Sequence, residues 1–181
     1  MTFTLYEIDN AQAPANKELE QSEKAFGFIP NLHKALAASP KTLEAYKYLH
    51  DQFQASSFNN TELTVVWQTI NYYNQCHYCL PAHTGIAHMM KVDQHVIDAL
   101  HNGEPLEDEK LAALQSTTRA IVDQRGHLDD QQLGAFNAAG YGNQQLLEIL
   151  LGLAQKTISN YTNHLAKTPV DKPFQQFVKE T

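Results

Sequence analysis

Two cysteines and a histidine lie in one short stretch of the chain, Cys76-His-Tyr-Cys79-Leu-Pro-Ala-His83. This CxxC pair contains the only two cysteines in 181 residues. If a helix begins near Cys76, a turn of about 100° per residue places Cys76, Cys79 and His83 on one stripe. A helix N-terminus and a nearby imidazole can lower the pKa of a cysteine below its free value of about 8.5. The stretch therefore predicts a redox dithiol, with Cys79 as the nucleophile, Cys76 as its resolving partner and His83 as the base.

Four other interpretations of the same stretch were weighed. Zinc binding would use Cys76, His77, Cys79 and His83, but a structural zinc site normally takes its second ligand pair from a separate segment. Attachment of c-type haem requires histidine directly after the second cysteine, where this chain has Leu80. A structural disulfide and a pair of inert buried cysteines are the two remaining alternatives. We expect a redox dithiol with no bound metal and no cofactor.

Length and composition limit the classes of function. With 43% hydrophobic residues, 181 residues are enough for one domain with a substantial core, and we expect one domain over residues 1–181. The formal charge of −7 argues against binding to nucleic acid or to an anionic membrane surface. No window approaches the roughly 18 apolar residues of a membrane span, and no basic segment precedes an apolar one at the start. We expect a cytoplasmic protein, and in that reducing compartment a CxxC pair is typical of catalysis or metal binding rather than of a structural cross-link.

Apolar residues recur at helical spacing along most of the chain, and no segment shows the alternation of a strand. Gly27, Pro40 and Gly103 are among the residues that predict helix ends. The predicted fold is an all-α helical bundle in which a helix hairpin carries the CxxC at the start of one helix. The predicted helices cover residues 15–26, 31–38, 40–54, 60–73, about 76–89, 92–100, 106–124, 129–139 and 143–166, with one further turn at 174–178.

The helix before the cysteines is expected to wall the redox site. Asn60 is its predicted N-cap, and Glu62 in its first turn has a favourable interaction with the helix dipole. Its apolar residues lie on more than one side, which is typical of a well buried helix. On the preceding helix, His50 belongs to an apolar stripe and is predicted to be a hydrogen-bonded core residue.

Several of these motifs together resemble a known family. The pattern Cys76-x-Tyr-Cys79-x-x-x-His83, with Glu62 on the preceding helix, is similar to the redox core of the carboxymuconolactone decarboxylase superfamily, in its alkylhydroperoxidase D-like, peroxidase-related branch. Two further blocks resemble that branch, Phe26-Gly-Phe-Ile-Pro-Asn-Leu upstream and Ser159-Asn-Tyr-Thr-Asn-His downstream, the latter followed by Thr-Pro-Val-Asp171. The resemblance runs from about residue 24 to residue 174.

The resemblance implies an all-α fold, a dithiol peroxidase activity and a homo-oligomer, as a dimer, trimer or hexamer. It implies a hydroperoxide substrate and an external dithiol reductant protein, lipoyl-bearing or thioredoxin-like. Under this hypothesis the thiolate of Cys79 attacks the peroxide and leaves as a sulfenic acid, which Cys76 then condenses with. The alternatives are a redox-sensing or poorly active scaffold protein of the same fold, and a decarboxylase or other lyase.

The chain also departs from the pattern of the hydroperoxidases proper. They carry a glutamate twelve residues before the first cysteine, where this chain has Thr64. Glu62 is two positions away, which is a rotation of about 200° on a helix, so it replaces that glutamate only if the chain folds back between it and the cysteines. Tyr78 stands where those enzymes often carry histidine, and it could donate a hydrogen bond to a peroxide oxygen.

Overall fold

The computed structural model describes residues 3–179, which form nine α-helices and one 3-10 helix, with no strand in this range. None of the helices in the described range is both long enough and apolar enough to span a membrane. The helices are α1 (Ala15–Phe26), α2 (Asn31–Leu36), α3 (Pro40–Gln54), α4 (Asn60–Tyr73), α5 (Cys79–Met89), α6 (Gln94–Asn102), α7 (Glu109–Asp123), α8 (Asp130–Ala138), α9 (Asn143–Ala166) and η1 (Lys172–Phe177). The predicted all-α fold is confirmed.

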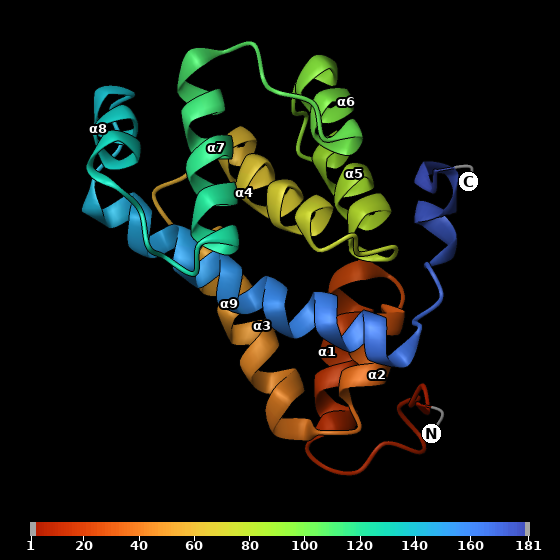
Figure 1. The fold of residues 1–181 in the computed structure, drawn as a ribbon. Helices are drawn as coiled ribbons and strands as arrows, with labels where there is room; N and C mark the ends of the chain where they lie inside the picture. The colour runs from red at the N-terminus through yellow and green to blue at the C-terminus, as the bar shows by residue number, and fades with distance from the viewer. Residues whose placement is uncertain (1–2, 180–181) are drawn as a thin grey trace.

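Helix α4 is the centre of the bundle, and it packs against α5, α6, α7 and α9 (Figure 1). Its middle is buried on every side, with Val65, Val66, Trp67 and Ile70 fully inaccessible to solvent. Trp67 meets Phe53 of α3 with ring centroids 5.2 Å apart. Rings of this size bury the largest apolar areas of any side chains, so this contact anchors α3 to α4.

The long helix α9 crosses the bundle and packs against α3 and α4 (Figure 1). The close approach depends on Gly152, because a Cβ atom at this position would lie 2.9 Å from the ring of Phe53 and 3.2 Å from Val66. A side chain there would force the helices apart. The missing side chain thus lets α9 bring its next two turns close to the start of α5.

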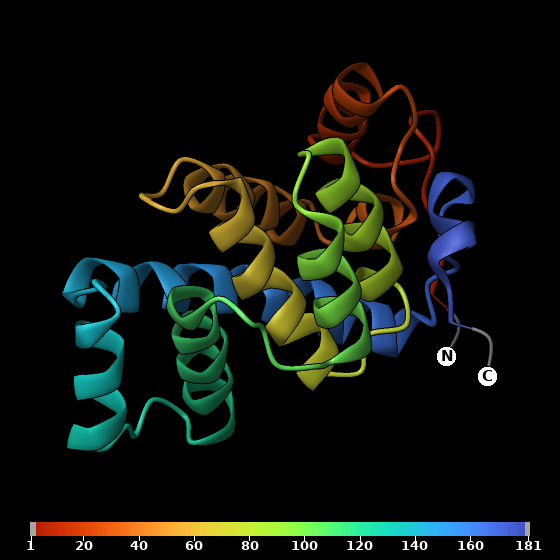
Figure 2. The same ribbon diagram turned by 90° about the horizontal axis from the view of Figure 1, so that it is seen from above.

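The segment after α9 returns along the bundle and ends in η1, which packs against α5 (Figure 2). A Cβ atom at Gly85 of α5 would lie 2.6 Å from the ring of Phe174 and 3.0 Å from that of Phe177. The two rings of η1 therefore rest directly on the backbone of α5. The prediction of one further turn at the end of the chain is confirmed in position.

Several predicted helix ends differ from the structure by one to three residues, and two predictions on the hairpin of α4 and α5 were wrong. The N-cap of α4 is Asn59, not Asn60, because the Asn59 side chain accepts hydrogen bonds from the backbone amides of Thr61 and Glu62. Helix α5 begins at Cys79, not near Cys76. Pro81 lies in its first turn, as predicted, where the missing amide hydrogen leaves no bond unmade.

Candidate active site

The two cysteines occupy the turn between α4 and α5. Helix α4 ends in a Schellman motif: Gln75 has a left-handed φ of 51°, its amide bonds to Tyr72, and the Cys76 amide bonds to the carbonyl of Asn71 at 3.0 Å. This motif places Cys76 just ahead of α5, where its Sγ accepts the backbone N–H of Cys79 at 3.3 Å. Both cysteines are buried and unbridged. The start of α5 therefore holds two reduced sulfurs side by side.

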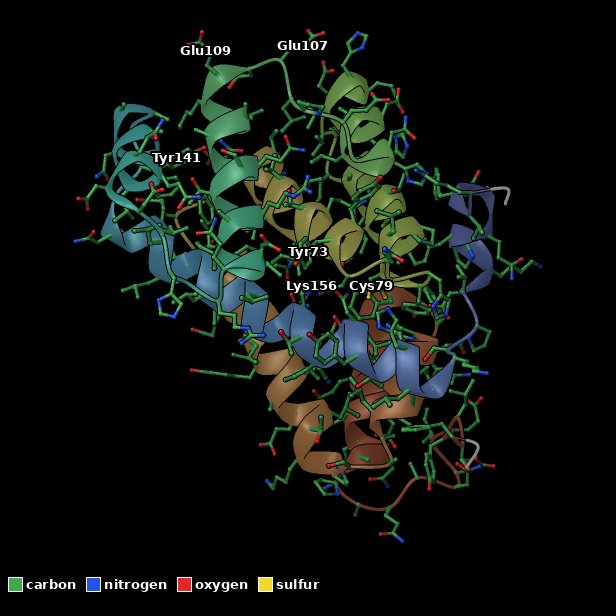
Figure 3. The ribbon with its side chains drawn as sticks, in the orientation of Figure 1. Tyr73, Cys79, Glu107, Glu109, Tyr141 and Lys156 are labelled. Atoms are coloured by element: carbon green, nitrogen blue, oxygen red, sulfur yellow. The ribbon has the colours of Figure 1, made fainter. Side chains whose placement is uncertain are left out.

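Helix α9 lays a polar face against these sulfurs. Lys156, Ser159, Asn160 and Asn163 are all buried, and the Asn163 amide donates to Cys79 Sγ at 3.3 Å. Lys156 is only 1% exposed, although it carries an amino group. Figure 3 labels Lys156 on α9 and Cys79 at the start of α5. A buried lysine needs a compensating partner, and the adjacent thiol can become one by losing its proton.

The surroundings shift the pKa values of the two thiols in opposite directions. Burial by itself raises the pKa of Cys79, but the hydrogen bond with Cys76, the charge of Lys156 and hydrogen bonds with Ser159 and Asn160 outweigh it, so its pKa lies below the ordinary value. The hydrogen bond to Cys79, burial and the charge of a Cys79 thiolate raise the pKa of Cys76. The surroundings therefore favour ionisation of Cys79 over that of Cys76.

His83 lies in the site beside Lys156. Its Nε2 is 2.9 Å from Lys156 Nζ, and its ring packs on Trp67 with centroids 4.8 Å apart. Within residues 3–179 it makes no hydrogen bond to either sulfur. Burial, the charge of Lys156 and His50 hold the pKa of His83 well below its usual value, so the ring is neutral. His83 therefore accepts a hydrogen bond from Lys156, and its role as the base for Cys79 stays a prediction.

A chain of buried amides fixes the start of α5 relative to α4 and α9. The Asn71 amide donates to the carbonyl of Cys79 at 3.3 Å and to Gln68 at 2.9 Å. Gln68 donates in turn to the carbonyl of Leu80 at 3.2 Å, and Asn160 donates to Asn71 at 3.0 Å. Satisfied buried amides of this kind hold one arrangement strongly, since any other leaves them unpaired.

Tyr78, a predicted donor to the peroxide, is engaged elsewhere. Its hydroxyl donates to the carboxylate of Asp171 and accepts the Leu32 amide at 3.2 Å. Asp171 also accepts the Asn31 amide at 3.0 Å. Tyr78 therefore links the cysteine turn to two distant segments, the start of α2 and the segment after α9. Through these contacts the upstream motif that contains Asn31 and Leu32 and the downstream motif that ends at Asp171 both bind the CxxC turn.

The four residues considered as zinc ligands do not converge. His77 is exposed and its Nε2 is 2.9 Å from the carbonyl of Thr168, whereas His83 is buried against Lys156. In the described part of the chain no group of three or more His, Cys, Asp or Glu side chains is arranged to hold a metal ion.

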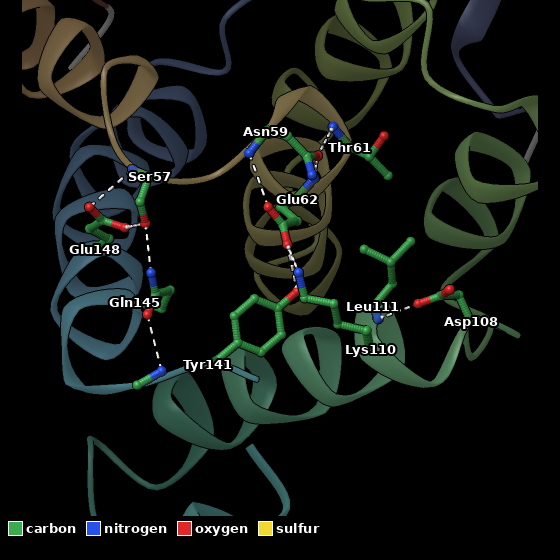
Figure 4. A network of polar contacts seen from close by, with 11 residues as sticks. Ser57, Asn59, Thr61, Glu62, Asp108, Lys110, Leu111, Tyr141, Gln145 and Glu148 are labelled. Atoms are coloured by element: carbon green, nitrogen blue, oxygen red, sulfur yellow. Dashed lines mark hydrogen bonds and ion pairs between the residues drawn. The ribbon is translucent and has the colours of Figure 1, made fainter. Parts of the chain in front are cut away.

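Glu62 lies at the far end of α4 (Figure 4). Its carboxylate accepts the Asn59 amide at 3.0 Å, pairs with Lys110 at 2.9 Å and accepts the Tyr141 hydroxyl at 2.9 Å. Eleven residues separate it from Tyr73 at the cysteine end, or about 16 Å at 1.5 Å per residue. The chain does fold back after α4, but the cysteines lie at the start of α5 and only the end of this helix, at Met90, approaches the start of α4. The structure therefore does not bring this carboxylate to the thiols.

Thr64 also takes no part in the site, because its hydroxyl donates to the Asn60 carbonyl at 2.8 Å within α4. The residue that supplies the charge near the sulfurs is Lys156, which the sequence analysis missed. A signal was present: Lys156, Ser159, Asn160 and Asn163 recur at helical spacing along one face of this helix. Such a stripe predicts a polar face directed at a partner.

A large cavity of about 1210 Å³ adjoins the dithiol. It lies among α4, α5, α6, α7 and the end of the chain, and Cys76, Leu80 and Pro81 form part of its wall. Cys79 does not line it. A molecule in this cavity would reach Cys76 before Cys79.

Comparisons with solved structures give the fold a name. The structure of an alkylhydroperoxidase AhpD core, an uncharacterised peroxidase-related protein from Ralstonia eutropha JMP134, aligns with a TM-score of 0.79 at 18% identity over 95% of this chain and 93% of that one. A peroxidase-related protein from Silicibacter sp. TM1040 aligns with a TM-score of 0.79 at 16% identity, over 96% and 95% of the two chains.

A third similar structure is a cysteine-to-alanine variant of the debrominase Bmp8 in complex with 2,3,4-tribromopyrrole. It aligns with a TM-score of 0.79 at 16% identity over 98% of this chain and 95% of that one. No family model and no curated protein matches the sequence. The three-dimensional likeness covers nearly the whole chain, and this chain therefore has the alkylhydroperoxidase D-like fold.

Proposed function

We propose that this protein is a thiol-dependent peroxidase that reduces hydroperoxides through a cycle of its Cys76–Cys79 pair. One observation carries the proposal: the buried Lys156 lies on the same face of α9 as Asn163, which donates a hydrogen bond to the Cys79 sulfur, and the second thiol accepts the Cys79 amide. Buried positive charge and hydrogen-bond donors stabilise a thiolate, which is the reactive form of cysteine. The second thiol provides the partner that a sulfenic acid needs to form a disulfide.

The reaction balances in three steps. The Cys79 thiolate attacks the terminal oxygen of a hydroperoxide, the O–O bond breaks, and Cys79 becomes a sulfenic acid while the leaving alkoxide takes a proton to form an alcohol. Cys76 then attacks the sulfenic sulfur, giving a disulfide and one molecule of water. An external dithiol reduces the disulfide by thiolate exchange and is itself oxidised to a disulfide.

The cavity supports a direction for that last exchange. In thiol–disulfide exchange the thiol of lower pKa is the better leaving group, which here is Cys79. The incoming thiolate would then attack Cys76, the sulfur that the cavity reaches. A lipoyl-bearing or thioredoxin-like protein is the class of reductant that we propose, in a reducing compartment such as the cytoplasm.

We also propose that the protein is a homo-oligomer. Leu147, Leu150, Tyr161 and Leu165 of α9 are all exposed, Leu165 to 72%. At about 100° per residue these four lie within about 60° of one another, so they form one apolar stripe. Exposed contiguous apolar surface of this kind is typical of protein interfaces.

Steady-state peroxide consumption with a dithiol reductant tests the proposal. Cys79→Ser should abolish turnover, whereas Cys76→Ser should consume about one equivalent of peroxide and then stall with a sulfenic acid that a dimedone probe traps. Equal turnover in the two variants and the wild type would rule the scheme out. A wild-type pair that oxidises without sustained turnover would instead indicate the redox-sensing alternative.

A second candidate is reductive dehalogenation of an aromatic substrate. The mainly apolar cavity beside Cys76 favours it, together with the likeness to a debrominase. The carbon–halogen bond would be replaced by a carbon–hydrogen bond, halide would leave, and the two thiols would supply the electrons by forming a disulfide. Halide release from 2,3,4-tribromopyrrole, absent in Cys79→Ser, would support this activity, and its absence in the wild type would exclude it for this substrate.

A further inference from the structure

The cavity beside the dithiol is much larger than hydrogen peroxide requires. Its volume of about 1210 Å³ is above the roughly 300–1,000 Å³ that small-molecule sites usually have. Ala112, Ala113 and Ser116 form its α7 wall, and these small side chains leave the space open. The opposite wall carries Leu80 and Pro81, next to Cys76. An extended, largely apolar molecule fits this shape.

The charge of the cavity has one sign. Arg119 and Lys179 line it, and none of its described lining residues is Asp or Glu, although the chain has 20 acidic and only 13 basic residues. Arg119 forms no ion pair with any residue in the range 3–179. Lys179 lies over the ring of Tyr72, with its Nζ 5.6 Å from the ring centroid. Asp123 lies outside the lining, where it accepts the hydroxyl of Tyr73 at 2.7 Å. Within the lining itself, two cations without a paired carboxylate leave a positive potential that an anion would neutralise.

Arg119 and Lys179 are the two lysine or arginine residues of the cavity lining, and its other side chains are polar, aromatic or apolar. His101 is bound to Thr84, with Nδ1 2.9 Å from the hydroxyl, and burial and Lys179 lower its pKa, so it stays neutral. Tyr72 and Tyr73 are partly exposed at 41% and 37% and line the same cavity. Aromatic side chains next to cations suit a ligand with an apolar body and an anionic end.

We infer that this cavity binds amphipathic carboxylates, and that the substrate class of the proposed peroxidase is the hydroperoxides of long-chain fatty acids. Arg119 and Lys179 would hold the carboxylate, the small-residue wall of α7 and the aromatic rings would cover the hydrocarbon chain, and the hydroperoxide group would reach the dithiol past Cys76. The reaction of the hydroperoxide group at the dithiol rests on the proposed function. Binding of the carboxylate by the cavity does not, and the two are tested separately.

Binding is measured first, by calorimetric titration with dodecanoate and with its methyl ester, neither of which can react. The wild type should bind dodecanoate at least 10-fold more tightly than the ester. Arg119→Gln and Lys179→Gln should each weaken dodecanoate binding about 10-fold and leave ester binding unchanged. Arg125→Gln and Lys172→Gln remove cations of the same kinds that do not line the cavity, and they should change nothing. Equal affinity for acid and ester, or no binding at all, would overturn the inference.

Turnover then separates this inference from the proposed function. With linoleic acid hydroperoxide, Arg119→Gln should raise KM about 10-fold at nearly constant kcat, and this rise should be several times larger than any change with tert-butyl hydroperoxide, which has no carboxylate. Charge-dependent dodecanoate binding without consumption of either peroxide would rule out the proposed peroxidase activity but support the binding site. Consumption of tert-butyl hydroperoxide with no effect of Arg119→Gln on the fatty-acid substrate would do the opposite.

Discussion

The two ends of the α4–α5 hairpin each hold an ionisable acid opposite a lysine, and they differ in what surrounds the pair. At one end Glu62 pairs with Lys110, whose side chain is 52% exposed, and a capping bond and Tyr141 complete the carboxylate's partners. At the other end Lys156 is buried, and its partners are a thiol and a neutral histidine. An ion pair open to water is worth little and is easily replaced, whereas a buried charge changes the pKa of its neighbours.

The comparison explains why only one end is suited to chemistry. The pKa of Glu62 is lowered: burial opposes this, but the Asn59 amide, Lys110 and Tyr141 outweigh it. A carboxylate that is already ionised in water gains only stability from such partners. A thiol that is mostly protonated in water gains reactivity when Lys156 lowers its pKa. A lysine near an ionisable acid therefore adds stability at the Glu62 end, whereas at the cysteine end it lowers the pKa of a thiol.

The largest expected effect comes from removing the buried charge. Lys156→Met keeps the length of the side chain but removes its charge. A rise in the pKa of Cys79 from about 5 by about two units would lower peroxide turnover about 50-fold at pH 5 and about twofold at pH 7. Turnover measured against pH should recover at alkaline pH. Lys110→Met, the matched change at the other end, should keep the pH profile of the wild type. A loss that does not recover with pH would point to misfolding instead.

Acid should destabilise the dithiol side of the molecule before the Glu62 side. Burial, Lys47 and His50 lower the pKa of His33 to about 3, below its unfolded value of 6.5, so the unfolded chain binds more protons below pH 6.5. The stability contribution is complete above pH 6.5 and is lost as pH falls, by about 2 kcal/mol at pH 5. Glu62 has a depressed pKa, so its contribution is lost only as pH falls below 4.5.

Denaturant unfolding at pH 7.5 and pH 5 measures the first of these windows. His33→Gln should remove about 2 kcal/mol of the difference between the two pH values, because glutamine does not titrate. A wild type equally stable at both pH values would contradict the assignment of a neutral buried imidazole.

Tyr78→Phe distinguishes the structural role of this hydroxyl from the predicted catalytic one. The variant leaves the carboxylate of Asp171, which is 5% exposed, without one of its partners, and should lower the free energy of unfolding by about 1.5 kcal/mol. The rate of the first peroxide reaction, measured in a stopped flow, should stay unchanged in the folded protein. A slower first reaction at full stability would restore Tyr78 as a donor to the peroxide.

The smallest effect is expected at Glu62. Glutamine can still complete the capping box with Asn59, so Glu62→Gln loses mainly the ion pair with half-exposed Lys110, worth about 0.5 kcal/mol. Denaturant unfolding should register that loss, while alkylation of the thiols proceeds at the wild-type rate. If Glu62→Gln slowed thiol alkylation, the two ends would be coupled and the contrast between them would fail.

Local signals in the sequence predicted most of the helices. The bounds of α1, α3 and α9 agree with the prediction, because each has a clear apolar period and an end marked by glycine or proline or by the turn before Thr168. The start of α5 was misplaced by three residues, since the left-handed turn at Gln75 carries no glycine to mark it. Local chemistry thus predicted where helices lie better than how two of them are joined.

The faces of α9 show what the sequence could not provide. Its apolar residues Leu147, Leu150 and Leu165 suggest a buried stripe, but they are exposed, and the face that packs inward includes Lys156 and Asn160. Asn160 is buried because Asn71, 89 positions earlier, accepts its hydrogen bond. The polar stripe of α9 indicates that this face has a partner, but it does not identify a partner so distant in sequence. The site's thiols were therefore predictable, and the position of the lysine beside them was not.

The central claim is that Lys156 makes Cys79 a thiolate near neutral pH, and the rate of iodoacetamide alkylation against pH tests it most directly. In a Cys76→Ser background, which leaves one thiol, the alkylation midpoint should lie below the free-cysteine value of about 8.5. Adding Lys156→Met should move it upward by about two units. A Cys79 that titrates near 8.5 with or without the lysine would contradict the account.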